Sequence, residues 1–295
     1  PAAFCSLYGY KPTYGAFSRY GMIAYASSLD QAGLLTHSIE DLQYLLASGL
    51  AEKDHRDMTS IGLNEVEGRK KAKLKIGFFP EFLENMSIDE NTRNAYQKLI
   101  NELKEKATLF PVSIDYMSNA AQVYYILATS EASSNLARYQ GVYTGNKLVD
   151  ENFEGTYWEQ CAQYRSKYFG KEVQKRIMIG SYILSAENYI EMYEKSIEIR
   201  KALKQSILNS LLEMDMLVLP TSPVTSPKWE DINKMTSAQI YMSDYMTVPF
   251  SLAGVPVISV PYAKTKEGLG IGFQFVGSPF KDAQLMEDIK TVIKG

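Results

Sequence analysis

Apolar positions recur at helical spacing in five segments of the chain. The first segment begins after Ser38, which is a favourable N-cap, and its apolar stripe consists of Ile39, Leu42, Leu45 and Leu46. The same spacing predicts further helices over residues 89–106, 120–139, 185–213 and 282–293. In the last of these, Asp282 is the expected N-cap. Helices with one apolar face are stabilised mainly by packing, so these segments should surround a common core.

Short apolar runs that end at turn residues predict strands. Residues 74–79 and 216–220 are nearly continuous apolar runs, which is typical of strands that are buried on both faces. A brief alternation predicts a strand over residues 112–115. Residues 255–261 and 271–277 flank the turn-forming KTKEG and should form two adjacent strands. Because the run 74–79 is followed by a helix, it resembles the first half of a βαβ unit.

Three stretches have no regular period. Residues 1–36 are rich in Gly, Tyr and Ser and predict short strands and tight loops. Residues 52–73 are charged and should form a surface loop. Residues 141–168 mix polar and aromatic side chains, and we expect an irregular, mobile or insertion-bearing surface there.

Composition narrows the class of protein. The chain has 295 residues, 45% of them hydrophobic and 22% charged, which is enough for a sizeable core in one large domain or two smaller ones. The net charge is −3, and the Lys and Arg residues are scattered. This pattern gives no basic face for a phosphate backbone, so contact with RNA should be made through a partner protein.

Metal ligands and membrane segments are not evident in the sequence. The two cysteines (Cys5, Cys161) and the two histidines (His37, His55) have none of the spacings that metal sites use. No apolar run approaches the roughly 18 residues of a membrane span, and the first residues do not form a signal peptide. We therefore expect a cytoplasmic protein without a metal.

Familiar catalytic motifs are also not evident. The sequence contains no GxSxG elbow, P-loop, HExxH or plausible Cys–His pair. A dyad of Ser27 or Ser28 with Asp30 is conceivable, but these side chains are more readily explained as partners of backbone groups in a turn. The alternate glycines of EGLGIG lead directly into a strand rather than into a helix, so they favour close backbone packing over nucleotide binding.

Several sequence blocks resemble the A subunits of tRNA-dependent amidotransferases, which belong to the amidase-signature family. Residues 1–36, with KPTYG, SRYG and SSLDQ, are similar to the segment that follows the Gly- and Ser-rich signature of that family. SEASSNLARY, FGKEVQKRIMIGSYILSA, YMSDYMTVPFSLAGVPVISVP and GFQFVGSPF are similar to later blocks. Ala16, Leu35 and His37 depart from the usual family residues. The resemblance extends from Pro1 to about Leu285.

The resemblance implies an α/β fold with a mixed central β-sheet flanked by helices, here lacking its N-terminal portion. Residues 1–295 would be one amidase-signature domain, truncated at its N-terminus. The serine nucleophile, the second serine and the lysine of the family match positions upstream of Pro1, so we assign no catalytic residue and expect this polypeptide alone to be inactive. We also expect strand 74–79 or 216–220 to be left with an unpaired edge or an uncovered face.

The resemblance further implies a site for free glutamine formed by Tyr124, Arg176 and Asp244. An arginine can hold an α-carboxylate bidentately, a carboxylate can accept from an α-ammonium, and a tyrosine hydroxyl can reach a third polar group. Each residue also has a structural interpretation. Arg176 could be a helix-surface charge, Asp244 a helix cap and Tyr124 a core aromatic residue.

The function implied is that of a glutaminase subunit. It would hydrolyse glutamine to supply ammonia, with which a partner amidates Glu-tRNA(Gln) or Asp-tRNA(Asn). The implied partners are the B and C subunits, with tRNA reached through the B subunit, and no cofactor or membrane is implied. The alternatives are a stand-alone amidase for small amides and a non-catalytic interaction module.

Overall fold

The computed structural model describes residues 1–84, 87–141, 154–232 and 244–293. The chain forms two compact units. The first unit comprises residues 1–21, 31–121 and 200–295, and the second comprises residues 22–30 and 122–199. The prediction of a single truncated domain is not tested by this division and stays a prediction.

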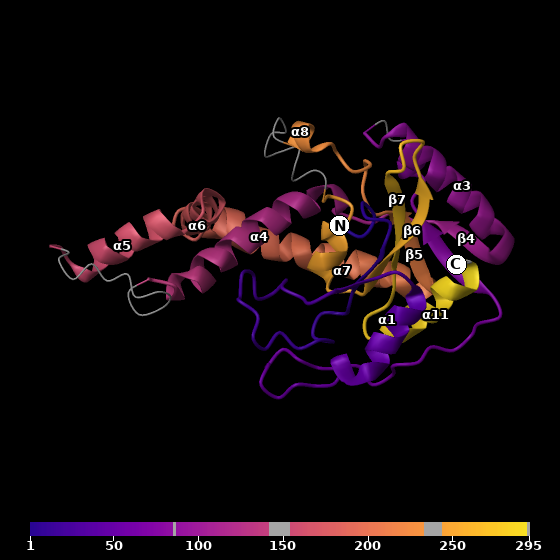
Figure 1. Ribbon diagram of the computed structural model, residues 1–295, viewed down its shortest axis with the longest axis horizontal. Helices are drawn as coiled ribbons and strands as arrows, with labels where there is room; N and C mark the ends of the chain where they lie inside the picture. Colours follow the sequence, from indigo (N-terminus) through magenta and orange to yellow (C-terminus); the bar gives the residue numbers. More distant parts are fainter. Residues whose placement is uncertain (85–86, 142–153, 233–243, 294–295) are drawn as a thin grey trace. The chain divides into compact units, whose positions relative to one another are not determined.

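The first unit is built on a seven-stranded sheet with the order β2-β1-β6-β7-β5-β3-β4 (Figure 1). The strands are β1 (Tyr8–Lys11), β2 (Leu34–Thr36), β3 (Leu74–Phe78), β4 (Ala107–Pro111), β5 (Met216–Pro220), β6 (Val257–Lys264) and β7 (Gly270–Val276). β3 is parallel to β4 and β5, whereas the other neighbouring pairs are antiparallel. The predicted mixed sheet is therefore confirmed.

Helices α3 (Glu90–Lys106) and α11 (Asp282–Val292) pack on the sheet. Side chains alternate between the two faces of a strand, so Phe273 and Phe275 of β7 share a face. Tyr96 of α3 stacks on Phe273 with ring centroids 5.7 Å apart. Its hydroxyl donates to the Val218 carbonyl at 3.0 Å and accepts from the Phe79 N–H at 3.1 Å. One buried tyrosine therefore joins α3 to three neighbouring segments.

Strands β3 and β5 lie inside the sheet rather than at its edges. β3 pairs with β4 and β5, and β5 pairs with β3 and β7. The expectation that one of these strands would have an unpaired edge is therefore wrong. The edges are β2, which has only three residues, and β4, which ends at Pro111, and short or proline-containing edge strands resist further pairing.

The fourth strand begins earlier than predicted. Its residues, Ala107–Pro111, follow α3 directly and pair in parallel with Leu74–Phe78. The prediction over residues 112–115 was wrong because pairing with β3 sets the register. The arrangement β3-α3-β4 completes the βαβ unit that the sequence suggested.

Asp282 begins α11 but does not cap it. The N-cap is Lys281, and the Asp282 side chain, which is fully buried, turns toward β1 instead. It accepts from the Tyr10 hydroxyl at 2.7 Å, the Thr13 N–H at 2.8 Å and the Thr13 hydroxyl at 2.6 Å. Asp282 thus fixes the segment that follows β1, and the predicted cap is corrected.

Apart from residues 200–213, which belong to a long helix that begins in the second unit, the other helical segments of the first unit are short. They are α1 (Ile39–Leu45), η1 (Leu46–Leu50), α2 (Glu81–Glu84), η2 (Met117–Asn119), α8 (Trp229–Ile232) and α10 (Val248–Ala253). α1 begins as predicted, because the Ser38 side chain accepts from the Asp41 N–H. None of the helices in the described ranges is long and apolar enough to cross a membrane.

The second unit is helical. Its segments are most of α4 (Ala120–Asn135), η3 (Leu136–Arg138), α5 (Tyr157–Tyr168), α6 (Lys171–Ile183), η4 (Tyr189–Glu194) and the start of α7 (Lys195–Glu213). Part of the stretch predicted as irregular is the helix α5, which starts with a reciprocal capping box between Thr156 and Glu159. Residues 142–153 of that stretch lie outside the described residues.

Candidate functional site

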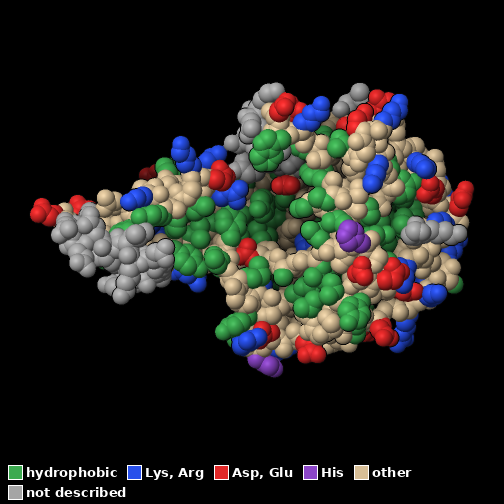
Figure 2. Space-filling view, in the orientation of Figure 1, with side chains coloured by type: hydrophobic (Ala, Val, Ile, Leu, Met, Phe, Trp, Pro, Cys, Tyr) green, Lys and Arg blue, Asp and Glu red, His purple; other side chains and the backbone are tan. Residues whose placement is uncertain are grey.

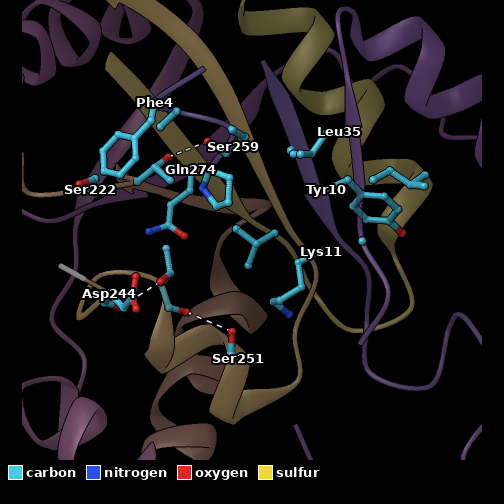
Figure 3. A pocket seen from close by; sticks show the side chains of 18 residues that line it. Phe4, Tyr10, Lys11, Leu35, Ser222, Asp244, Ser251, Ser259 and Gln274 are labelled. Atoms are coloured by element: carbon cyan, nitrogen blue, oxygen red, sulfur yellow. Dashed lines mark hydrogen bonds between the residues drawn. The ribbon is translucent and has the colours of Figure 1, made fainter. Parts of the chain in front are cut away.

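A cavity of about 400 Å³ lies in the first unit. It is on the sheet face that carries Gly9, Ser259 and Gln274, which are register partners or neighbours in β1, β6 and β7. The segment Pro1–Phe4 forms one wall, and the turn before α10 forms another (Figure 3). The cavity therefore draws its walls from several segments that are distant in sequence.

Two glycines of β7 bring the first residues of the chain against the sheet. A Cβ atom at Gly270 would lie 2.4 Å from the Ala3 carbonyl oxygen, and one at Gly272 would lie 2.8 Å from the Ala3 Cβ. Such approaches are possible only for glycine. The interpretation of EGLGIG as a close-packing segment is therefore confirmed for Gly270 and Gly272 and is wrong for Gly268, where a Cβ would meet no atom within 4 Å.

Polar side chains gather in the cavity. The hydroxyls of Thr221 and Ser259 are hydrogen-bonded at 2.9 Å, and the Ser251 hydroxyl donates to the Thr247 carbonyl. Gln274 is buried and donates from Nε2 to the carbonyl oxygens of Pro220 and Met246. A mostly apolar cavity with a few converging polar groups is typical of a binding site.

Asp244 lies at the mouth of this cavity. Its backbone carbonyl accepts from the N–H groups of Thr247 and Val248, so it heads the turn before α10. No described residue donates to its carboxylate, and partial desolvation raises the pKa of this carboxyl above its ordinary value. The N-cap position of α10 belongs to Thr247, so the interpretation of Asp244 as a helix cap is not supported.

Lys11 lines the same cavity from β1. Its Nζ donates to the Val255 carbonyl at 2.5 Å and to Gln31 Oε1 at 3.3 Å, and Gln31 in turn donates to the Pro12 carbonyl at 3.0 Å. Burial lowers the pKa of Lys11 to about 7, although the Asp282 charge opposes this shift. The Lys11 side chain therefore joins β1 to the segment before β2 and to the turn before β6. Its ammonium group titrates near neutral pH.

Lys11→Met should remove a pH dependence of stability. Between about pH 7 and about pH 10.4, unfolded Lys11 binds a proton that the folded side chain does not, so the free energy of unfolding rises with pH. The slope from one proton is at most about 1.4 kcal/mol per pH unit. Urea unfolding of the complete protein from pH 7 to 10 should show wild type gaining stability relative to Lys11→Met. Parallel curves for the two proteins would contradict the neutral lysine.

Arg176 lies on α6 in the second unit. Its Nε is 2.9 Å from the carboxylate of Glu172, one turn earlier, and its Nη1 donates to the Tyr25 hydroxyl at 2.7 Å. The guanidinium carbon is 5.4 Å from the Tyr25 ring centroid. The side chain remains 27% exposed. Arg176 is thus held in place by Glu172 and Tyr25 rather than being an unrestrained surface charge.

Tyr25 interacts with both residues of the second unit that are predicted to bind the substrate. Burial raises the pKa of the Tyr25 hydroxyl, the Arg176 hydrogen bond lowers it, and the nearby hydroxyls of Tyr124 and Tyr125 raise it. Arg176 therefore contacts Tyr25 directly, and Tyr124, which is only partly buried, acts on the Tyr25 hydroxyl electrostatically. Sequence reasoning missed Tyr25 because a tyrosine in a loop carries no motif.

The suggested serine–aspartate dyad does not form. The Asp30 carboxylate accepts from the backbone N–H groups of Tyr25 and Ala26, as the turn interpretation predicts. The Ser28 hydroxyl donates to Glu131 at 2.5 Å instead. Asp30 therefore shapes the loop that carries Tyr25.

The charge distribution agrees with the pattern of charges in the sequence. Figure 2 shows Lys and Arg side chains interspersed with Asp and Glu on the face drawn, as expected for a net charge of −3. Within the described ranges, no group of three or more His, Cys, Asp or Glu side chains is arranged to hold a metal ion.

The residues predicted to bind glutamine are divided between the two units. Tyr124 and Arg176 belong to the second unit, and Asp244 belongs to the first. Arg176 is bound to Tyr25, whose hydroxyl also feels Tyr124 electrostatically, and Asp244 lines a cavity. Convergence of all three on one ligand stays a prediction.

Comparison with known proteins agrees with the resemblance found in the sequence. The A subunit of the glutamyl-tRNA(Gln) amidotransferase of Sulfurimonas denitrificans is 37% identical over 97% of this chain and 63% of its own length. That of Chloroflexus aggregans is 40% identical over 97% of this chain and 58% of its own length. The chain therefore spans about 60% of the length of these relatives.

A solved structure and a family model extend this agreement. The crystal structure of the glutamyl-tRNA(Gln) amidotransferase A subunit from Thermotoga maritima superposes with a TM-score of 0.74 at 30% identity, over 97% of this chain and 57% of that chain. The family model described as Amidase matches residues 1–286. The mixed sheet, the sequence blocks and this match agree, and the chain belongs to the amidase family.

Proposed function

We propose that this chain is part of the glutamine-hydrolysing A subunit of a tRNA-dependent amidotransferase. The complete subunit would release ammonia from glutamine for the amidation of glutamate or aspartate on a mischarged tRNA. The observation that carries the proposal is the presence of an available carboxylate, Asp244, at a cavity of the size of a small ligand. Relatives named as amidotransferase A subunits at 36–40% identity support it.

The contribution of this chain is the recognition of the free amino acid. A carboxylate at Asp244 suits the α-ammonium of glutamine, and the guanidinium of Arg176 suits its α-carboxylate. Glu172 and Tyr25 hold the guanidinium and orient it. The Tyr124 hydroxyl would complete the polar contacts.

The proposal includes partners and a compartment. Because the basic residues of this chain are scattered along its sequence, a B subunit would bind the tRNA and a C subunit would complete a heterotrimer. The assembly would act in the cytoplasm, where aminoacyl-tRNA is used. Co-purification of the complete protein with the products of neighbouring genes would identify these subunits.

Arg176→Ala should raise the KM of the complete enzyme for glutamine by about 10- to 150-fold, the range expected when a hydrogen bond to a charged group is lost. Turnover at saturation should change far less, because the guanidinium contacts the amino acid and not the scissile amide. Release of ammonia, measured against glutamine concentration, gives both constants.

Lys175→Ala is the matched control, because Lys175 is an exposed basic residue next to Arg176 on α6. Its KM should stay near that of wild type. If Arg176→Ala behaves like this control, the role of Arg176 in binding glutamine is excluded. If simple aliphatic amides are cleaved as efficiently as glutamine, the protein is a stand-alone amidase instead.

A further inference from the structure

Gln274 has one orientation in the cavity. It lies in the interior strand β7 and is 1% exposed. Its Nε2 donates to the Pro220 carbonyl at 3.1 Å and to the Met246 carbonyl at 2.8 Å. Only the NH₂ group of an amide can donate, and a flipped amide would place its oxygen against two carbonyl oxygens. The positions of the amide nitrogen and oxygen are therefore determined by the two carbonyls.

The oxygen of this amide has no described partner. Gln274 Oε1 is buried, and no described residue donates a hydrogen bond to it. Gln274 lines the cavity, and Figure 3 shows its amide among the lining side chains, with the oxygen on the cavity side. Buried carbonyl oxygens without donors are rare in native proteins, because they forgo hydrogen bonds that water would provide. This oxygen is therefore suited to a ligand donor.

The same side chain supports the segment that carries Asp244. Its Nε2 holds the carbonyl of Met246, two residues after Asp244, in the turn that precedes α10. The lining of the cavity thus includes an amide oxygen and a carboxylate, and both can only accept when the carboxyl is ionised. A primary ammonium carries three N–H donors on one atom, so it can donate to both kinds of acceptor.

We infer that Gln274 determines specificity by accepting a hydrogen bond from the ammonium group of the amino-acid substrate, beside the carboxylate of Asp244. This inference rests on the proposed function, because it takes a free amino acid as the ligand. Asp244 provides the charge. Gln274 provides a second hydrogen-bond acceptor. A cation must therefore carry N–H donors, as an amine does, to satisfy both groups.

The test compares glutamine with 4-carbamoylbutanoate, which is glutamine without its α-ammonium. For the complete wild-type enzyme, kcat/KM should be higher for glutamine. Gln274→Met, which has a similar volume and no amide, should reduce this preference by about tenfold or more, as expected for a lost hydrogen bond to a charged group. The substitution should lower kcat/KM for glutamine and leave kcat/KM for 4-carbamoylbutanoate nearly unchanged.

A purely structural role gives a different result. If Gln274 only holds the carbonyls of Pro220 and Met246, Gln274→Met will impair both substrates equally, and the inference is overturned. Gln274→Glu is the second variant, because it keeps an acceptor oxygen while losing the NH₂ group. It should retain the preference for glutamine, and loss of the preference in a folded Gln274→Glu protein would also count against the inference.

The proposed function fails separately. A complete wild-type protein that does not hydrolyse glutamine, or that does not distinguish the two substrates, would remove the amino-acid assignment and this inference with it. A wild type that distinguishes them while Gln274→Met keeps the full preference would remove only the role of Gln274.

Discussion

Asp282→Ala should lower the free energy of unfolding by about 3–5 kcal/mol. The Asp282 carboxylate accepts from three buried donors, which are the Tyr10 hydroxyl and the N–H and hydroxyl of Thr13. Each buried donor left without a partner costs about 1–3 kcal/mol, and the three losses are not fully additive because two come from one residue. The loss should be near the upper end for single substitutions, since the site is completely buried.

Urea unfolding of the complete protein at neutral pH measures this loss, with Glu90→Ala as the control. Glu90 is the first residue of α3 as Asp282 is of α11, but it is exposed. Both substitutions remove an acid from a helix N-terminus, an interaction worth about 0.3–1 kcal/mol. Equal effects of the two would mean that the buried hydrogen bonds of Asp282 contribute nothing, contrary to this account.

Elements with local signals could be predicted from the sequence. The helix starts at Ser38 and Asp89 were predictable because each side chain accepts from a backbone N–H three residues later. Strands β5, β6 and β7 were predictable because apolar runs are bounded by Pro and Gly. The mixed sheet itself followed from the family resemblance rather than from these runs.

Features that depend on pairing between distant segments could not be predicted. β4 is set by its register with β3, so alternation at residues 112–115 misled the prediction. Asp282 has the sequence position of an N-cap, but its carboxylate accepts hydrogen bonds from β1 and the segment after it instead. The start of α5, by contrast, was missed although its local signal was present, because Thr156 and Glu159 form a capping box whose signature is visible in the sequence.

The candidate site was only partly predictable. Tyr124, Arg176 and Asp244 came from the resemblance, because single tyrosines and charges carry no signal of their own. Lys11 and Gln274 were missed as site residues, since their roles come from burial and from carbonyls that are contributed by other segments. Such residues become visible only when the fold has placed the acceptors around them.

Gly180→Ala should destabilise the second unit by about 3 kcal/mol, the upper end of the cost of overpacking. Helix propensity alone predicts the opposite, because alanine is favoured over glycine by about 1 kcal/mol in a helix interior. A Cβ at position 180 would lie 2.0 Å from the Thr129 carbonyl oxygen and 2.6 Å from its carbonyl carbon. These are backbone atoms of α4, so no side-chain rotation can relieve the clash, and α6 must move away from α4.

Gly170→Ala is the control, because Gly170 is the N-cap of the same helix and a Cβ there would meet no atom within 4 Å. Hydrogen exchange of the α6 amides should accelerate in Gly180→Ala and stay near wild type in Gly170→Ala. Arg176 lies one turn before Gly180, and it reaches the Tyr25 hydroxyl only while α6 keeps its place. Gly180→Ala should therefore raise the KM for glutamine, although residue 180 touches no ligand. An unchanged KM together with accelerated exchange would mean that substrate binding does not depend on the packing of α6.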